Sequence, residues 1–212
     1  MDHSRRKGDK PRVDSCAPAP QARAGAVTHR LTKELARAES LALMLATSRA
    51  AAFVDVSDYL AGIYIYDWER LSKFWEEQEA ICDYLQRICR ISPERWHHWI
   101  EFYDKERRGE DRANPRKFIG AANNSTGDRT QLGFSRDLAA VLRRAEVIAP
   151  HRDTFEGRSI PILTTECVLL SIVWDAESEI GHKVLETGLD VARLERAARH
   201  PRHAPLHGDE GK

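Results

Sequence analysis

Two segments of matching chemical character lie far apart in the chain, and this repetition limits its possible folds more than any other feature. Residues 31–36 (LTKELA) and 134–139 (FSRDLA) agree in residue type at six successive positions. Each opens a series of apolar residues at offsets 0, 4, 7, 11 and 14, which is one stripe along an α-helix. Internal repetition of this kind predicts two similar helical units that pack on each other. The stripes are Leu31, Leu35, Ala38, Ala42 and Leu45, and Phe134, Leu138, Val141, Ala145 and Ile148.

The two stripes have matching helix-start signals. Thr32 and Ser135 stand where a hydroxyl can accept a hydrogen bond from a free backbone N–H, so both are predicted N-caps. Glu34 and Asp137 place negative charge in the first turn, where the helix dipole favours it.

A second matched block follows each helix, at residues 54–63 and 163–172. Each block predicts a capped start and a short buried helix. Leu31 lies 23 residues before Val54, whereas Phe134 lies 29 residues before Leu163, so the second copy carries six extra residues. We expect them in a surface loop around 154–162, because insertions are tolerated there.

Each half is predicted to close with two further helices, 80–89 and 93–103 in the first half and 179–186 and 191–199 in the second. Ser92 and Asp190 are predicted N-caps, and Gly188 is a predicted C-cap. The sequence therefore predicts an all-α protein of two pseudo-symmetric four-helix repeats that form one helical bundle.

Composition sets the predicted boundaries. Residues 1–27 form a predicted disordered basic tail, because they have almost nothing large and apolar to bury. The predicted repeats cover 28–103 and 132–199, and residues 104–131 are a predicted charged linker rich in turn formers. Prolines at 201 and 205 predict a flexible tail over 200–212.

The repeated pattern resembles the Clp amino-terminal (Clp N repeat) domain family, here as a stand-alone member without the AAA+ ATPase module. The resemblance rests on the two helix openings, on the stretch from 184 to 194, and on residues 163–170 (LTTECVLL), where the family has a Gly-Thr-Glu-His-Leu-Leu-Leu type segment. The chain departs from the family at two positions. The histidine position holds Asp58 and Cys167, and the acidic position holds Ser57 and Glu166.

The resemblance implies a domain that docks adaptors, degrons or other Clp subunits, and in some members binds phosphoarginine through the acidic position of each repeat. It implies a peptide-binding position at Glu166, with Thr165 beside it and Ser57 as the counterpart in the first copy. Ser57 cannot pair with a guanidinium as a carboxylate does. A second interpretation of Glu166 is a first-turn acid that complements the helix dipole.

The first copy also carries an aromatic insertion that the second copy lacks. Two stripes have the spacing i, i+3, i+7, namely Trp68, Leu71 and Trp75, and Trp96, Trp99 and Tyr103. One interpretation is that both stripes are core, where two helices pack on each other. The alternative is that Trp68, Trp75, Trp96 and Trp99 form a partner surface, since tryptophan concentrates at binding hot spots.

Several chemistries are disfavoured by the sequence. No GxxxxGK[ST] phosphate-binding loop occurs, and neither the histidines nor the four cysteines have the spacing of a metal site. We find no catalytic constellation and expect no enzyme activity, no cofactor and no metal. Equal numbers of basic and acidic residues, 33 each, disfavour a general nucleic-acid binder. Neither a secretory segment nor a membrane span is recognisable, so we expect a cytoplasmic protein.

The favoured function is a non-enzymatic protein-binding module, a Clp N-like accessory or adaptor in the setting of chaperones and proteolysis. Its expected partner is a Clp AAA+ ATPase, a protease subunit or a substrate peptide. The alternative is a helical bacterial regulatory protein that contacts nucleic acid through Arg143, Arg144 and its basic tail.

Overall fold

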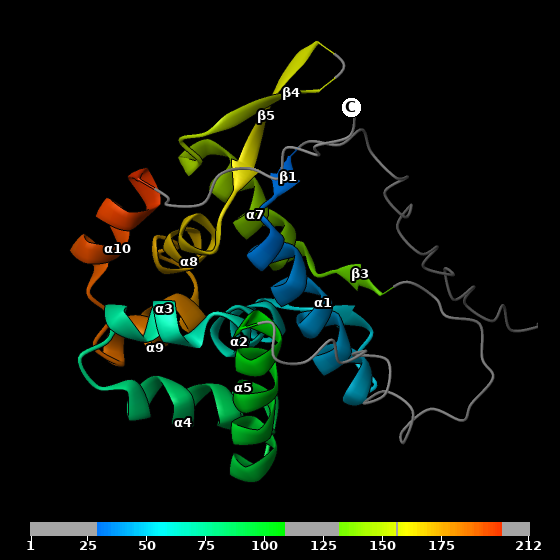
Figure 1. The fold of residues 1–212 in the computed structure, drawn as a ribbon, viewed down its shortest axis with the longest axis vertical. Helices are drawn as coiled ribbons and strands as arrows, with labels where there is room; N and C mark the ends of the chain where they lie inside the picture. Colours follow the sequence, from blue (N-terminus) through cyan, green and yellow to red (C-terminus); the bar gives the residue numbers. More distant parts are fainter. Residues whose placement is uncertain (1–28, 109–131, 156, 201–212) are drawn as a thin grey trace, which may run out of the picture.

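The computed structural model of the chain describes residues 29–108, 132–155 and 157–200, and this part is mostly helical with small sheets (Figure 1). The elements of the first half are β1 (Arg30–Leu31), α1 (Lys33–Ser48), β2 (Phe53–Val54), α2 (Val56–Tyr66), α3 (Trp68–Leu71), the 3-10 turn η1 (Ser72–Phe74), α4 (Gln78–Cys89) and α5 (Pro93–Arg108). Those of the second half are β3 (Gly133–Phe134), α7 (Arg136–Ile148), β4 (Arg152–Phe155), β5 (Arg158–Leu163), α8 (Thr165–Val173), α9 (Glu179–Glu186) and α10 (Val191–Arg199).

The first helices of both halves begin at their predicted caps. The Thr32 hydroxyl accepts a hydrogen bond from the backbone N–H of Leu35 at 3.4 Å, and the Ser135 hydroxyl accepts one from Leu138 at 3.1 Å. These bonds satisfy backbone donors that have no partner inside the helix. The two predicted N-caps are confirmed.

Several of the other predicted helix ends agree with the structure. Helices α9 and α10 have the predicted bounds, and the Asp190 carboxylate accepts from the backbone N–H of Arg193 at 2.9 Å. Ser92 accepts from Arg95 at 3.3 Å before α5. Gly188 follows α9 with a positive φ of +83°, the left-handed conformation that often ends a helix.

Helices α2 and α8 are central, because every residue of both is buried. Helix α1 packs on α2, and α7 packs on α8. The α1–α2 contact is close at Gly62, where an added Cβ would lie 2.4 Å from the carbonyl oxygen of Ala38. Glycine is therefore required at this crossing. The predicted stripe residues face these contacts, since Leu35, Leu45 and Leu138 are at most 1% exposed.

Short parallel strands join the two halves reciprocally. The strand before α1 pairs with the strand before α8, with Leu31 opposite Leu163. The strand before α2 pairs with the strand before α7, with Val54 opposite Phe134. Each pairing extends into the following cap residue, because Thr32 N donates to Leu163 O at 3.0 Å and Ser135 N donates to Val54 O at 2.9 Å.

These strands correct the all-α prediction. The six extra residues of the second copy also form strand rather than a surface loop. Strands β4 and β5 pair antiparallel, with Asp153 opposite Ile160, and the β4–β5 hairpin extends away from the helices at the top of Figure 1. The side chain of Asp153 pairs with that of Arg30 on β1. Backbone pairing across the three-stranded sheet β1-β5-β4 stabilises a segment that was predicted to be a loop because it is an insertion.

Helix α5 continues to Arg108, five residues into the segment 104–131 that was predicted as a linker. An ion pair between Asp104 and Arg108 at 2.8 Å, four residues apart, supports the last turn of this helix. Residues 109–131 and the predicted tails at 1–27 and 201–212 lie outside the described residues. No helix of the described ranges is long and apolar enough to cross a membrane.

Candidate functional site

Glu166 lies in the first turn of α8, two residues after the N-cap Thr164. The Thr164 hydroxyl caps this helix by accepting from the backbone N–H of Cys167 at 3.2 Å. Glu166 is 3% exposed and Thr165 is fully buried. A buried carboxylate needs a charged or hydrogen-bonding partner, because the loss of hydration is otherwise not compensated.

The partner of Glu166 is an arginine of the same chain. Arg70 in α3 holds its Nη1 3.0 Å from Glu166 Oε1, and its Nε donates to Asp67 Oδ2 at 2.7 Å. The Nη2 of Arg70 contacts both Asp67 Oδ2 and the hydroxyl of Thr165. Each nitrogen of the guanidinium therefore has an acceptor. The resemblance implied that Glu166 contacts the guanidinium of a bound peptide. In the structure, the guanidinium that contacts Glu166 belongs to Arg70 of the same chain.

Two carboxylates, those of Asp67 and Glu166, contact Arg70 in this cluster. The Thr165 hydroxyl lies 3.3 Å from Asp67 Oδ2 and 3.3 Å from Glu166 Oε2, so it bridges the two acids. Burial raises the pKa of Asp67, and the charge of Glu166 raises it further, while Arg70 and Thr165 act in the opposite direction. The geometry favours a planar cation with several N–H donors over a compact ammonium.

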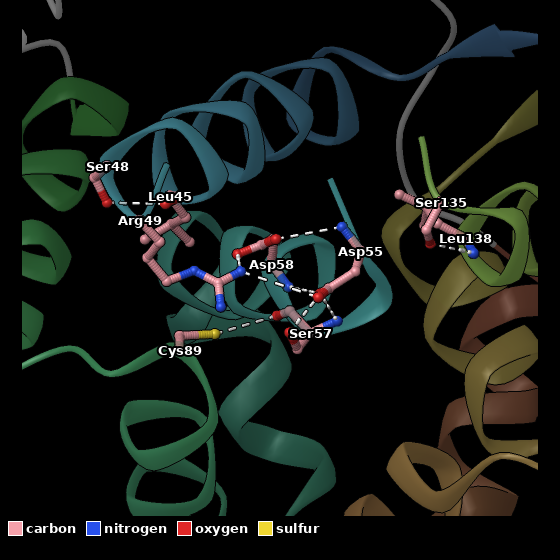
Figure 2. Close-up of polar contacts among 9 residues, drawn as sticks. All are labelled: Leu45, Ser48, Arg49, Asp55, Ser57, Asp58, Cys89, Ser135 and Leu138. Carbon is pink, nitrogen blue, oxygen red and sulfur yellow. Dashed lines mark hydrogen bonds and ion pairs between the residues drawn. The ribbon is translucent and has the colours of Figure 1, made fainter. Parts of the chain in front are cut away.

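The first half uses its acids differently, as Figure 2 shows. Asp55 caps α2, because its Oδ1 accepts from the backbone N–H groups of Ser57 at 2.8 Å and Asp58 at 3.1 Å. Asp58 Oδ2 in turn accepts from the backbone N–H of Asp55 at 3.2 Å. This reciprocal pair is a capping box. Ser57 is part of that cap, with its hydroxyl bonded to Asp55 at 2.5 Å, and not a counterpart of Glu166 in ion pairing.

Asp58 is the buried acid of the first half. It is fully buried and forms an ion pair with Arg49, the residue directly after α1. Burial raises the pKa of Asp58, whereas the hydrogen bond from Asp55 and the charge of Arg49 lower it. Both halves therefore place a buried carboxylate in the first turn of a central helix and neutralise it with an arginine, at positions one residue apart in the repeat alignment.

Sequence reasoning did not find Arg49, Arg70 or Asp67. Arg70 lies 95 residues from Thr165 along the chain, so nothing in local spacing indicates this contact. The one local signal is the i, i+3 spacing of Asp67 and Arg70, which is typical of a pair on one helical turn.

Three of the four tryptophans assigned to a partner surface lie in the interior instead. Trp75, Trp96 and Trp99 are between 1% and 6% exposed, and Trp68 is half-buried against the core. Tyr64 lies between two of them, edge-on to Trp75 at 5.5 Å and stacked on Trp96 at 6.1 Å between ring centroids. The partner-surface interpretation is wrong for Trp75, Trp96 and Trp99, because these rings are buried, and those of Trp75 and Trp96 contact Tyr64 of α2.

Exposed apolar side chains occur at places that the sequence did not single out. Phe53 on β2 is 56% exposed, and Trp174 at the end of α8 is 49% exposed. Phe134, predicted in the buried stripe, is 39% exposed and touches Tyr59 only edge-on, at 6.2 Å between centroids. Phe134 lies in β3, one residue before the cap of α7, where it pairs with Val54 of β2 and is not part of the helix.

The cysteines of the described residues are unsuited to nucleophilic chemistry. Burial raises the pKa of Cys82 and Cys167, and it raises the pKa of Cys89 to about 12. A thiol of high pKa carries little thiolate at neutral pH. Within the described ranges, no group of three or more His, Cys, Asp or Glu residues could hold a metal ion.

The two arginines proposed for nucleic-acid contact, Arg143 and Arg144, have different environments in the structure. Arg143 is exposed, but Arg144 of α7 forms an ion pair at 2.5 Å with Asp175, two residues after the end of α8. One of the two charges is therefore used inside the fold.

Comparison with family models, with curated proteins and with solved structures finds no match to this chain.

Proposed function

We propose that this protein is a non-enzymatic protein-binding module, a Clp N-like accessory or adaptor that recognises a Clp subunit, another adaptor or a substrate peptide. The observation that carries the proposal is the reciprocal strand pairing. Leu31 and Phe134 are equivalent positions of the two repeats, and so are Val54 and Leu163. Leu31 of the first repeat pairs with Leu163 of the second, and Val54 of the first pairs with Phe134 of the second. These are the positions at which the two halves of the chain match in sequence.

The proposed architecture follows from this equivalence. Helices α1, α2, α4 and α5 form one repeat, and α7, α8, α9 and α10 form the other, with a pseudo-twofold relation between them. Matched caps at Thr32 and Ser135 and the equal burial of α2 and α8 support the relation. The Clp N-like assignment rests on this repeat together with the segment at residues 163–170.

Binding rather than catalysis is favoured by the state of the polar groups. The buried acids at Asp58, Asp67 and Glu166 are neutralised by arginines of the chain, which leaves them poor candidates for a free general base. The thiols have raised pKa values. Exposed apolar side chains at Phe53 and Trp174 offer contact area to a protein partner.

Calorimetric titration of the full-length chain with purified Clp ATPase and protease subunits of the same host tests the proposal. We expect saturable binding to one of these components. Parallel titration with non-specific DNA serves the alternative, because phosphate contacts give a steep dependence of the binding constant on salt. Absence of binding to any Clp component, together with steeply salt-dependent DNA binding, would replace the proposal with the regulatory alternative.

A further inference from the structure

We propose that the solvent-facing side of α10 is a docking surface for an acidic protein segment. Three arginines of this helix, Arg193, Arg196 and Arg199, form the surface together with Lys73 of η1, and we call these four residues the basic face. The inference rests on the proposed function, because it assumes that the chain binds protein, and it specifies the chemistry of one partner segment.

The three arginines lie on one side of α10, at the outer edge of the described elements (Figure 1). They are three residues apart and all exposed, so consecutive arginines are separated by about 60° around the helix axis. The opposite side carries Leu194 and Ala198, which are 0% and 1% exposed, and the helix packs on α8. The apolar side therefore fixes α10 to the core, and the cations are presented to solvent at a set spacing.

Acids of the described chain do not neutralise the arginines of the basic face. Within residues 29–108, 132–155 and 157–200, neither Arg196 nor Arg199 forms an ion pair. The Arg193 side chain donates to the carbonyl oxygen of Lys73 at 2.6 Å, which orients its guanidinium but leaves its charge uncompensated. Glu195, the acidic residue within α10, is half-buried and pairs with none of the three in the described chain. The face therefore keeps its charge for an external anion.

The helix dipole accounts for only part of this charge pattern. Cations are stabilised in the last turn of a helix, where Arg196 and Arg199 lie. Arg193 is the third residue of α10, close to the positive end of the dipole, where a cation is disfavoured. The arginines thus extend along the whole helix and beyond the end that the dipole favours. A surface for an anionic partner accounts for all three.

The composition of the basic face favours the carboxylates of a protein over a nucleic-acid backbone. Arginine binds carboxylates through two parallel hydrogen bonds. Four cations would neutralise at most about four phosphates, compared with roughly 6–10 for a protein whose DNA binding is steeply salt-dependent. Helix α10 has no aromatic side chain that could stack on bases. Equal numbers of basic and acidic residues, 33 each, also leave the chain without a net positive field for holding a polyanion.

The spacing of the arginines indicates the form of the partner segment. An α-helix rises about 1.5 Å per residue, so Arg193 and Arg199 are separated by about 9 Å along the axis of α10. A second helix with acidic residues at every third or fourth position presents carboxylates over the same interval on one side. The partner segment is therefore an acidic helix that lies along α10.

Fluorescence anisotropy of a labelled acidic peptide tests the basic face. The probe is an alanine-based helical peptide with glutamates at i, i+4 and i+7, titrated with the full-length chain, and the control peptide has glutamines at these positions. We expect saturable binding of the glutamate peptide alone, and at least about tenfold weaker binding by Arg196→Gln/Arg199→Gln. Arg87→Gln/Arg90→Gln removes two exposed arginines of the same spacing at the end of α4, and it should bind like the wild type.

Titration of a short duplex DNA in the same assay tests the other class of partner. We expect weaker binding than to the glutamate peptide, and tighter DNA binding that Arg196→Gln/Arg199→Gln abolishes would overturn the proposal in favour of nucleic acid. The wild type gives a further test, because its affinity for the glutamate peptide should fall as ionic strength rises. Salt-independent binding, equal binding by both double variants, or no saturable binding would overturn the proposal. No Clp component is used, so these failures are distinct from absence of Clp binding, which tests the proposed function.

Discussion

Among individual residues, the buried acids Glu166 and Asp58 show how the chain compensates buried charge. Glu166, in the first turn of α8, is paired with Arg70 at 3.0 Å. Asp58, in the other half, is paired with Arg49. A buried charge is tolerated only when it is paired and hydrogen-bonded, so these arginines are as necessary to the fold as the acids.

The substitution Glu166→Gln should therefore affect stability as well as binding. It removes the carboxylate that faces Arg70 Nη1 but leaves Asp67 as a partner, so we expect a loss of about 1–3 kcal/mol in the free energy of unfolding. Urea unfolding followed by circular dichroism measures it. Glu177→Gln, at an exposed position, is the matched control and should change stability little. An unchanged midpoint for Glu166→Gln would show that the ion pair contributes nothing.

Glu39 should make stability depend on pH in the mildly acidic range. Burial raises its pKa above the ordinary value of 4.5, although the hydrogen bond from Tyr59 at 3.1 Å opposes this. The folded state then holds the proton more tightly than the unfolded state, so stability falls as pH rises from the unfolded pKa through the folded pKa. We expect the wild type to lose stability more steeply than Glu39→Gln as the pH rises above the ordinary pKa of 4.5. Melting temperatures across this range measure the difference, and identical slopes would contradict it.

At the level of helices, the apolar stripes and the close crossings determine packing. Helix α7 shows the distinction well, because Leu138 is completely buried whereas Val147, on the same helix, is 87% exposed. Position on the helix, rather than residue type, decides how much each side chain contributes.

Leu138→Ala should cost about 2–5 kcal/mol of unfolding free energy, through lost apolar burial and the cavity that remains. Val147→Ala is the control on the same helix and should change stability by less than about 0.5 kcal/mol. Denaturant titration of both variants gives the two values. Similar costs at the two positions would mean that α7 does not pack through the face described.

Gly62→Ala tests the α1–α2 crossing. The new Cβ would lie 2.4 Å from the Ala38 carbonyl oxygen, which is backbone and cannot rotate away. Overpacking of this kind typically costs about 1–3 kcal/mol, so we expect a clear fall in the denaturation midpoint. Gly133→Ala is the comparison, because its Cβ would meet only a Phe53 ring atom at 3.9 Å. A Gly62→Ala variant as stable as the wild type would disprove the close approach.

Across the whole molecule, the reciprocal strands make the two halves dependent on each other. Neither β1 nor β2 has a partner strand within its own half, and α2 also contacts α7 and α8. Loss of one half would leave these strands and the core face of α2 without their partners. The described part of the chain should therefore unfold as one unit.

This cooperativity is measured by comparing the urea unfolding transitions that two spectroscopic probes report. Tryptophan fluorescence reports mainly on the first half, which contains Trp68, Trp75, Trp96 and Trp99, whereas circular dichroism reports on the helices of both halves. We expect the two urea transitions to superimpose. A variant with phenylalanine at these four positions, which keeps only Trp174, should give the same midpoint for fluorescence and circular dichroism. Separate transitions would show that the halves fold independently.

The sequence by itself determined the helices and their starts. Caps such as Thr32, Ser135 and Asp190 act through backbone groups three residues away, and apolar stripes act through one helix face. Both signals are local, so they can be read without the fold. The matched positions of the two halves were recognisable for the same reason.

Only the tertiary structure decided the strands, the surface and the partners of the buried acids. Strands of two residues carry no periodicity of their own, and β1 exists because β5 supplies its hydrogen bonds from more than a hundred residues away. Phe134 continues a helical stripe in sequence but lies in β3, outside the helix, and is exposed. Arg70 contacts Glu166 because the chain folds α3 onto α8. The two residues are far apart in the sequence, so their ion pair leaves no local sequence pattern.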